Sequence, residues 1–259
     1  MPISKAVART VLGAIGNVAS CTFFLSSAPS VWQMIRNKSM QGGVSGDLFV
    51  FKLFNCILWM FYGLPMVHPH NFWVFLTNSF GCLFALSYIS LYLYYASRKQ
   101  RGRIICELGT ILLLFGVLVV VVLLYKDYPR LKVMIAGTVC AVISSLMHLT
   151  LLSQMGKLLK TKDTKYFLPY SSVGAFFKGA VWTAYGLVNL DIYIMVPNGF
   201  GIIIGTIQLI LFIIVLYTRN IEVTKVDFVD DLNLKIVDQV GSTKPVQMNL
   251  DVKTPCVNP

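Results

Sequence analysis

The chain has 259 residues, of which 56% are hydrophobic and 13% are charged, and its mean hydropathy is +0.70. Several nearly charge-free runs of roughly 20 residues could each cross a bilayer core about 30 Å thick, which excludes an ordinary soluble domain. Continuous apolar runs, rather than alternation, predict transmembrane helices and not a barrel. The net charge of +11 does not indicate nucleic acid, because basic loops that fix membrane orientation explain it.

Seven helical spans follow in chain order. We interpret the first as a retained helix, because it is too long for a signal peptide and no small-residue cleavage site closes it. Beyond the last span, charged residues replace the apolar runs, and we expect a mostly disordered cytoplasmic tail. The predicted spans cover residues 10–34, 47–67, 71–95, 104–125, 132–156, 167–190 and 193–217.

The basic residues predict how the spans are oriented. Lys and Arg cluster after the first, third and fifth spans, whereas the loops after the second and sixth spans carry neither. Because basic loops favour the cytoplasm, the N-terminus is expected outside and the C-terminus inside. Lys5 and Arg9, together with Lys126, Arg130 and Lys132 after the fourth span, run against this rule.

An internal repeat organises the spans. The segment Trp59-Met-Phe-Tyr62-Gly63-Leu64 returns as Trp182-Thr-Ala-Tyr185-Gly186-Leu187, and Thr77-Asn78-Ser-Phe80-Gly81 returns as Pro197-Asn198-Gly-Phe200-Gly201. The copies are offset by 120 to 124 residues. The fourth span has no counterpart, and this extra crossing lets the second three-helix unit keep the orientation of the first. We therefore predict an all-α membrane protein with parallel repeats at 1–97 and 131–217, a linker helix within 98–130, and a tail at 218–259.

These motifs resemble the SWEET family of sugar uniporters. The resemblance covers residues 10–217, and its sharpest parts are Asn55 through Pro65, Trp182 through Asp191 and Val196 through Gly201. The related PQ-loop carriers would show a Pro-Gln pair, which this sequence lacks. The resemblance implies a sugar held by paired asparagines, Asn78 and Asn198, on an aromatic platform at Trp182 with its partner position at Trp59. It also implies an extracellular gate made by Tyr62, Tyr185 and Asp191, with His70 as a cationic partner.

The same residues suit a sugar on chemical grounds. An Asn side chain offers two donors and two acceptor lone pairs for hydroxyl groups, and Trp offers a broad face for a ring. A single such residue is more often an interface anchor or a helix–helix contact. Their repetition in register favours a site. We predict a mid-membrane cavity lined by Trp59, Asn78, Trp182 and Asn198, with Asn55 and Lys178 nearby.

Lys178 departs from the family pattern, which has Asn at this position, as Asn55 is in the first copy. A charge halfway along a span costs at least ~2.5 kcal/mol. Lys178 must therefore face the cavity, find a partner or lose its proton. Glu107 and His148 are candidate partners, and contact with a hydroxyl-rich or anionic substrate is the alternative.

The sequence also predicts where the chain bends. Pro29, Pro65, Pro169 and Pro197 disrupt helical hydrogen bonding and could act as pivots, with helix ends or static kinks as the alternative. Gly63 and Gly186 follow the gate tyrosines, where their permissive backbones suit bending. Two further hinge positions of the family are occupied here by Leu48 and Leu151.

The expected function is bidirectional, facilitative sugar transport by alternating access. Glu107 is the one intramembrane carboxylate expected, and an interfacial role for it favours passive transport over proton coupling. Trp59 narrows the cavity, so glucose or a related hexose is favoured, with sucrose as the larger substrate to be tested. A PQ-loop-like carrier of amino acids and a proton-coupled sugar transporter are the two competing functions. No enzyme motif, metal spacing, cofactor or nucleic-acid partner is indicated. We expect the plasma membrane, with a vacuolar or other endomembrane location and a homo-oligomer left open.

Overall fold

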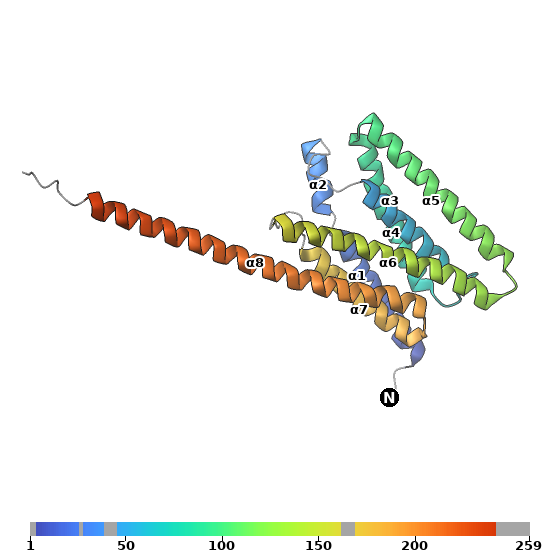
Figure 1. Ribbon diagram of the computed structural model, residues 1–259. Coiled ribbons are helices and arrows are strands. Elements are labelled where there is room, and N and C mark those ends of the chain that lie inside the picture. Colours follow the sequence, from blue (N-terminus) through green and yellow to red (C-terminus); the bar gives the residue numbers. More distant parts are fainter. Residues whose placement is uncertain (1–3, 26–27, 39–45, 162–168, 242–259) are drawn as a thin grey trace, which may run out of the picture. The chain divides into compact units, whose positions relative to one another are not determined.

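The computed structural model describes residues 4–25, 28–38, 46–161 and 169–241, and within these ranges it contains eight helices and no strand. The chain divides into two compact units, Met1–Ile213 and Ile214–Pro259. Helix α8 belongs in part to each. The helices are α1 (Lys5–Leu25), α2 (Ala28–Asn37), α3 (Gly46–Tyr62), α4 (Phe72–Tyr95), α5 (Arg98–Leu124), α6 (Pro129–Thr161), α7 (Pro169–Asn189) and α8 (Ile192–Gly241) (Figure 1).

The contacts between helices follow the internal repeat. Within the first copy, α4 packs on both α1 and α3. Between the copies, α1 packs on α7 and α3 packs on α6. The first helix of each copy therefore meets the second helix of the other copy, as expected for parallel repeats about an axis along the membrane normal. This arrangement places α3 and α7, which carry the Trp and Tyr of the repeat, at the boundary between the copies.

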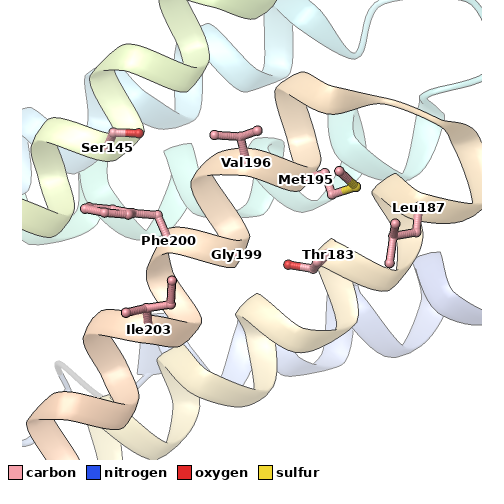
Figure 2. A pocket seen from close by; sticks show the side chains of 8 residues that line it. All are labelled: Ser145, Thr183, Leu187, Met195, Val196, Gly199, Phe200 and Ile203. Atoms are coloured by element: carbon pink, nitrogen blue, oxygen red, sulfur yellow. The ribbon is translucent and has the colours of Figure 1, made fainter.

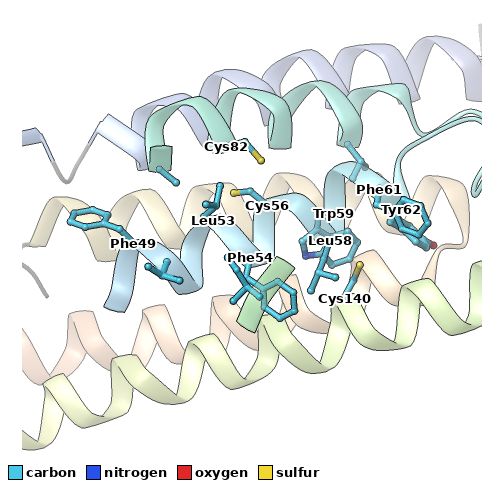
Figure 3. Close-up of a cluster of buried hydrophobic side chains, with 14 of the residues drawn as sticks. Phe49, Leu53, Phe54, Cys56, Leu58, Trp59, Phe61, Tyr62, Cys82 and Cys140 are labelled. Atoms are coloured by element: carbon cyan, nitrogen blue, oxygen red, sulfur yellow. The ribbon is translucent and has the colours of Figure 1, made fainter. Parts of the chain in front are cut away.

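Helix α3 supplies much of the buried core. Its side chains pack towards α4 on one side and α6 on the other (Figure 3). Cys56 faces Cys82 of α4, while Leu58 and Trp59 lie towards Cys140 of α6 (Figure 3). The thiols act here as small apolar groups. α3 has 17 residues, and it is fixed chiefly by these neighbours.

Five of the described helices are long and apolar enough to span a membrane by length and composition. They are α1, α4, α5, Pro129–His148 of α6 and Ile192–Thr218 of α8. α5 is apolar on nearly all sides, and it buries a single stripe of Ile104, Ile111, Leu118 and Val122. The remaining faces suit contact with lipid, since a helix that is hydrophobic all round belongs in a membrane or a core. A capping box between Ser97 and Gln100 satisfies its first turn.

Close approach of helices occurs at equivalent glycines in both copies. A Cβ at Gly13 of α1 would collide with the ring of Trp73 in α4, and a Cβ at Gly137 of α6 would collide with Tyr193 in α8. Each aromatic ring thus packs directly on a helix backbone. The first and third helices of each copy are held together in this way.

Replacing Gly13 by Ala should lower the stability of the purified protein by about 1–3 kcal/mol, the usual cost of overpacking a filled site. Thermal unfolding in detergent measures the change. Gly116→Ala in α5 is the matched control, because a Cβ there meets nothing within 4 Å. The control should be neutral or stabilising, and equal destabilisation by both variants would contradict this view of the α1–α4 contact.

The structure corrects two predicted boundaries. The first span, predicted at residues 10–34, is divided into α1 and α2. Pro29 lies in the first turn of α2, where its missing backbone N–H costs no helical hydrogen bond. The sequence places the end of the last span at residue 217, but α8 continues to Gly241. No proline occurs between Asp191 and Gly241 other than Pro197, and charged residues alone do not stop a helix. Residues 242–259 of the predicted tail lie outside the described residues.

Candidate functional site: paired hydrogen bonds between the repeats

Two tyrosines bridge the copies at the loop ends of α3 and α7. The Tyr62 hydroxyl lies 3.0 and 2.9 Å from the two carboxylate oxygens of Asp191. The Tyr185 hydroxyl donates to Asn71 Oδ1 at 3.1 Å. Asn71 Nδ2 in turn donates to Asp191 Oδ2 at 3.1 Å. We call Tyr62, Asn71, Tyr185 and Asp191 the gate cluster, and all four are buried.

The two acceptors of the gate cluster occupy equivalent places. Asn71 precedes α4 and Asp191 precedes α8, and each is the N-cap position of its helix. Asp191 Oδ1 accepts from the backbone N–H groups of Tyr193 and Ile194 at 3.1 and 3.2 Å, as an N-cap carboxylate should. Asn71 makes no side-chain cap bond, because its amide is committed to the opposite repeat. In each copy, therefore, the Tyr hydroxyl donates a hydrogen bond to the other copy, and the N-cap side chain accepts one from the other copy's Tyr.

The histidine predicted for the gate is the wrong one. His70 is exposed and has a φ of 70°, so it lies in the left-handed turn before α4 and outside the gate cluster. His68 stands there instead, with Nδ1 2.9 Å from Asn71 Nδ2 and Nε2 3.6 Å from Asp191 Oδ2. Sequence reasoning also missed Asn71. The repeat carried the signal, since Asn71 precedes Asp191 by 120 residues, the same offset as between Asn78 and Asn198.

One turn from each tyrosine, the two tryptophans also bond across the repeats. Trp59 Nε1 donates to Ser144 Oγ of α6 at 2.7 Å, and Trp182 Nε1 donates to Ser20 Oγ of α1 at 3.0 Å. We call these the Trp–Ser pairs. Each indole stacks edge-on against its tyrosine, with ring centroids 5.5 Å apart for Trp59–Tyr62 and 5.2 Å for Trp182–Tyr185. The predicted tryptophans are thus equivalent in structure as well as in sequence.

The Trp–Ser pairs differ in one respect. Ser144 Oγ also donates to Asn55 Oδ1 at 2.7 Å, which joins Asn55 to Trp59 through one hydroxyl. On the other side, Lys178 stands where Asn55 does. The two indoles are consequently held by unequal networks.

Removing a serine should leave a buried indole N–H without its partner, which costs about 1–3 kcal/mol. Ser144→Ala should be the more damaging change, since it frees both Trp59 and Asn55, whereas Ser20→Ala frees only Trp182. The loss is measured as a lowered unfolding temperature in detergent. Thr22→Ala is the control in α1, because its exposed hydroxyl only bonds the Ala19 carbonyl. If Thr22→Ala cost as much as Ser144→Ala, the assigned role of the hydroxyls would be wrong.

The paired asparagines also have matching geometry. Asn78 Nδ2 donates to the Val74 carbonyl and Asn198 Nδ2 to the Ile194 carbonyl, both at 2.8 Å. Both side chains are half-buried. These bonds fix the amide planes, and within the described part of the chain the Oδ1 atoms have no hydrogen-bond partner. Each amide can therefore still accept a hydroxyl group.

Lys178 lies one turn beyond Trp182, on the side away from the gate cluster. Its Nζ is 5.0 Å from the ring centre of Phe23 and 5.9 Å from that of Phe24. Such cation–π contacts contribute roughly 0.5–2 kcal/mol, so they offset part of the insertion cost but accept no hydrogen bond in the usual sense. Among the described residues no carboxylate or carbonyl bonds to Lys178. Glu107, one of the two candidate partners, bonds instead to Arg103 at 3.0 Å.

A groove lies elsewhere, on the second repeat (Figure 2). Its volume is about 520 Å³, and Ser145 and Thr183 are its two hydroxyl-bearing side chains. None of the six predicted substrate residues lines it. An open groove with so few polar groups suits lipid better than a sugar, which needs several hydrogen-bond partners. The other lining residues are Leu187, Met195, Val196, Gly199, Phe200 and Ile203. A shared cavity at the Trp–Ser pairs stays a prediction.

The predicted hinges fall into two groups. Pro29 and Pro169 lie in the first turns of α2 and α7, and Pro65 lies in the turn after α3, while Pro197 lies inside α8. Of these four prolines, only Pro197 has helical residues of the same helix on both sides within the described residues. Gly63 and Gly186 serve close packing: added Cβ atoms would lie 2.5 Å from the Phe75 nitrogen and 3.0 Å from the Met195 nitrogen. That packing explains these glycines without any need for bending.

The helix arrangement and the paired bonds together define a multi-pass membrane carrier made of two parallel three-helix repeats and a linker helix. A family described as sugar efflux transporter for intercellular exchange matches residues 10–100 and 134–220. The chain belongs to this family, the SWEET transporters.

Relatives of known name agree with this assignment. The chain is 32% identical over 253 residues to the bidirectional sugar transporter SWEET7b of Oryza sativa subsp. japonica, covering 98% of this chain and 91% of the relative. It is 32% identical to SWEET4 of Arabidopsis thaliana, covering 81% and 83% respectively. A solved structure of a eukaryotic SWEET transporter superimposes with a TM-score of 0.77 at 29% identity, covering 83% of this chain and all of that one. The predicted family and fold class are confirmed.

Proposed function

We propose that the protein is a bidirectional, facilitative transporter that moves a hexose, with glucose favoured, by alternating access between its two repeats. The support is the set of four hydrogen bonds that join the repeats at one end of the path: Tyr62–Asp191, Tyr185–Asn71, Trp59–Ser144 and Trp182–Ser20. All four link one copy to the other. Rocking of one copy against the other would have to break them together, which is the property of a gate.

In this proposal the sugar ring lies beside the Trp–Ser pairs, and Asn78 and Asn198 bond its hydroxyl groups. Each indole has its N–H committed to a serine, so the tryptophans would contribute ring faces. Asn55 and Lys178 lie on the side away from the gate cluster and would meet the substrate as it leaves. Sucrose is the larger alternative substrate.

Passive transport agrees with the charges of the path. Asp191 is buried, but it is fully engaged by Tyr62, Asn71 and the first turn of α8. Glu107 is paired with Arg103. A carboxylate that couples protons should instead be able to gain and lose a proton during each cycle.

Uptake of labelled glucose into proteoliposomes tests this proposal. Uptake should reach the equilibrium level, should speed up when unlabelled glucose is loaded on the opposite side, and should not exceed equilibrium under a pH gradient. Accumulation driven by the pH gradient would indicate proton coupling. Uptake of a cationic amino acid in place of glucose would favour the PQ-loop-like alternative, and labelled sucrose in the same assay measures the size limit.

We also propose a plasma-membrane location with the N-terminus outside. Two of the five basic residues that run against this orientation make local contacts at the loop ends near the gate. Arg9 Nε donates to Asn189 Oδ1 at 2.7 Å, and Lys132 Nζ donates to the Met66 carbonyl at 2.7 Å. The first contact joins α1 to the end of α7, and the second joins α6 to the loop after α3. These contacts account for both basic side chains without a place in the cytoplasm.

A further inference from the structure

We propose that Arg9 and Lys132 hold the gate cluster closed, by fastening the first helix of each copy to the second helix of the other copy or the turn after it. We call the Arg9–Asn189 and Lys132–Met66 contacts the basic latches. This inference rests on the proposed function, because a latch acts only in a gate that opens. It adds two positioning residues to that gate.

The two basic latches occupy equivalent places in the repeat. Arg9 Nε, near the start of α1, donates to Oδ1 of Asn189, the last residue of α7, at 2.7 Å. Lys132 Nζ, in the first turn of α6, donates to the carbonyl of Met66, in the turn after α3, at 2.7 Å. The two cations are 123 residues apart in the sequence, and so are their acceptors. The latches therefore cross between the copies in the same way as the four hydrogen bonds of the proposed gate.

A cation suits both places because of the helix that it meets. Asn189 ends α7, and Met66 lies in the turn that directly follows α3. The C-terminal end of a helix carries a partial negative charge, which favours a nearby Lys or Arg side chain. The acceptors themselves are a neutral amide and a carbonyl, so each cation can exchange its bond for one to water when the gate opens. A buried ion pair would resist this step, since breaking it leaves an uncompensated charge.

Both latches hold segments that carry the gate cluster. Asn189 Nδ2 donates to the Tyr185 carbonyl at 2.9 Å, so the acceptor of the first latch is bonded to the backbone of a gate tyrosine. Asn189 also lies two residues before Asp191, and Met66 lies five residues before Asn71. Moving either acceptor away from its cation would therefore move an N-cap residue of the gate cluster with it.

The two latches should differ in strength. Arg9 and Asn189 are half-buried, whereas the contact of Lys132 with Met66 is exposed. Exposed contacts of charged side chains contribute little, because water competes for both partners. Arg9 should thus hold the gate more firmly than Lys132.

Spin labels on the two gate loops measure the opening in the full-length protein. His70 and Leu190 are exposed, and each lies in a left-handed turn two residues before a helix of the second or fourth pair, α4 or α8, with φ of 70° and 57°. The labels are attached at His70→Cys and Leu190→Cys after the six native cysteines are replaced by alanine. Pulsed electron paramagnetic resonance in nanodiscs then gives the ratio of long to short distances, which is the ratio of open to closed gates.

Arg9→Gln should raise this ratio about 3- to 10-fold, the effect of losing one hydrogen bond, and Lys132→Gln should raise it less. Arg9→Lys should keep most of the wild-type distribution. Asn189→Ala should act like Arg9→Gln, and the double variant should go no further, because the two residues share one contact. Lys5→Gln and Arg130→Gln are the matched controls and should change nothing. Each removes a charge from the start of the same helix, and neither side chain bonds to any described residue.

An unchanged distance distribution in both Arg9→Gln and Asn189→Ala would overturn the inference, even if the variants unfolded at a lower temperature, because a static tie affects stability alone. An equal change in Lys5→Gln would also overturn it, since charge and not contact would then be the cause. If Arg9→Gln does not fold, Asn189→Ala decides. Failure of the proposed function is seen separately, as absent glucose uptake by the wild type in proteoliposomes. Glucose uptake together with unmoved labels in these variants would refute this inference alone.

Discussion

Alanine in place of Asn78 or Asn198 should abolish sugar uptake, with at least a hundredfold loss of rate, while the protein still folds and reaches the membrane. Each amide is locked by a 2.8 Å bond to its own helix, so its oxygen is presented without further ordering. Loss of two or more hydrogen bonds to a bound sugar, at roughly 0.5–1.5 kcal/mol each, and of the orientation they impose would account for an effect of this size. Initial rates of labelled glucose uptake in proteoliposomes measure it.

Two residues in the same helices provide matched controls. Ser87 of α4 and Thr206 of α8 also donate to the carbonyl four residues earlier, at 2.8 Å each, but both are exposed. Ser87→Ala and Thr206→Ala should leave uptake close to that of the wild type. If uptake survived in both Asn78→Ala and Asn198→Ala, the assignment of the sugar site would be refuted. If the controls failed too, the loss would reflect helix structure and not the site.

The second large effect is expected at the gate cluster. Tyr62→Phe should raise the population of the open gate more than Tyr185→Phe does. Tyr62 bonds a carboxylate and Tyr185 bonds a neutral amide. A hydrogen bond to a charged group contributes about 1.5–3 kcal/mol and a neutral one about 0.5–1.5 kcal/mol. At 1.4 kcal/mol per factor of ten, Tyr62→Phe should raise the open population about 10- to 100-fold, and Tyr185→Phe about 2- to 10-fold.

Cys140 is a natural reporter for this measurement. It is fully buried in α6 and belongs to the cluster of buried side chains that α3 contributes to (Figure 3). With the other five cysteines replaced by alanine, its modification by an impermeant thiol reagent, supplied only on the gate side of sealed vesicles, reports opening. Tyr128→Phe, an exposed tyrosine of the loop before α6, is the control and should leave the rate unchanged. Equal rates for Tyr62→Phe and Tyr185→Phe would contradict the unequal bonds seen in the structure.

Much of this architecture could be predicted because the internal duplication makes the same residues occur twice in the sequence. Trp59 and Trp182 return at one offset, and large aromatic residues within apolar spans are easily recognised. Ser20 and Ser144 return at a similar offset but could not be recognised in the same way. A serine in an apolar helix carries little signal by itself, because it normally bonds to its own backbone. Its role becomes visible only when the facing indole is known.

Other features depend on how the chain turns, which periodicity does not encode. His68 and His70 are equally plausible gate residues in sequence. The left-handed φ of 70° at His70 turns that residue outward, whereas His68 lies within reach of Asn71. Likewise, the sequence offers Glu107 as a candidate partner for Lys178. In the structure Glu107 pairs instead with Arg103, which lies four residues earlier on the same face of α5. Local pairs at this spacing compete well against distant ones.

The crossed bonding also bears on how such a molecule could arise. A single three-helix unit would carry two hydrogen-bond donors, the hydroxyl of its Tyr and the N–H of its Trp, and two acceptors, its N-cap side chain and its Ser hydroxyl. In this structure each of these bonds joins one copy to the other, so a single unit could not form them alone. Half of this chain would be incomplete unless it associated with a twin, in which both tyrosines would face identical caps. Within one polypeptide the two caps can differ, and here Tyr62 bonds a carboxylate while Tyr185 bonds a neutral amide, so the two bonds differ in strength.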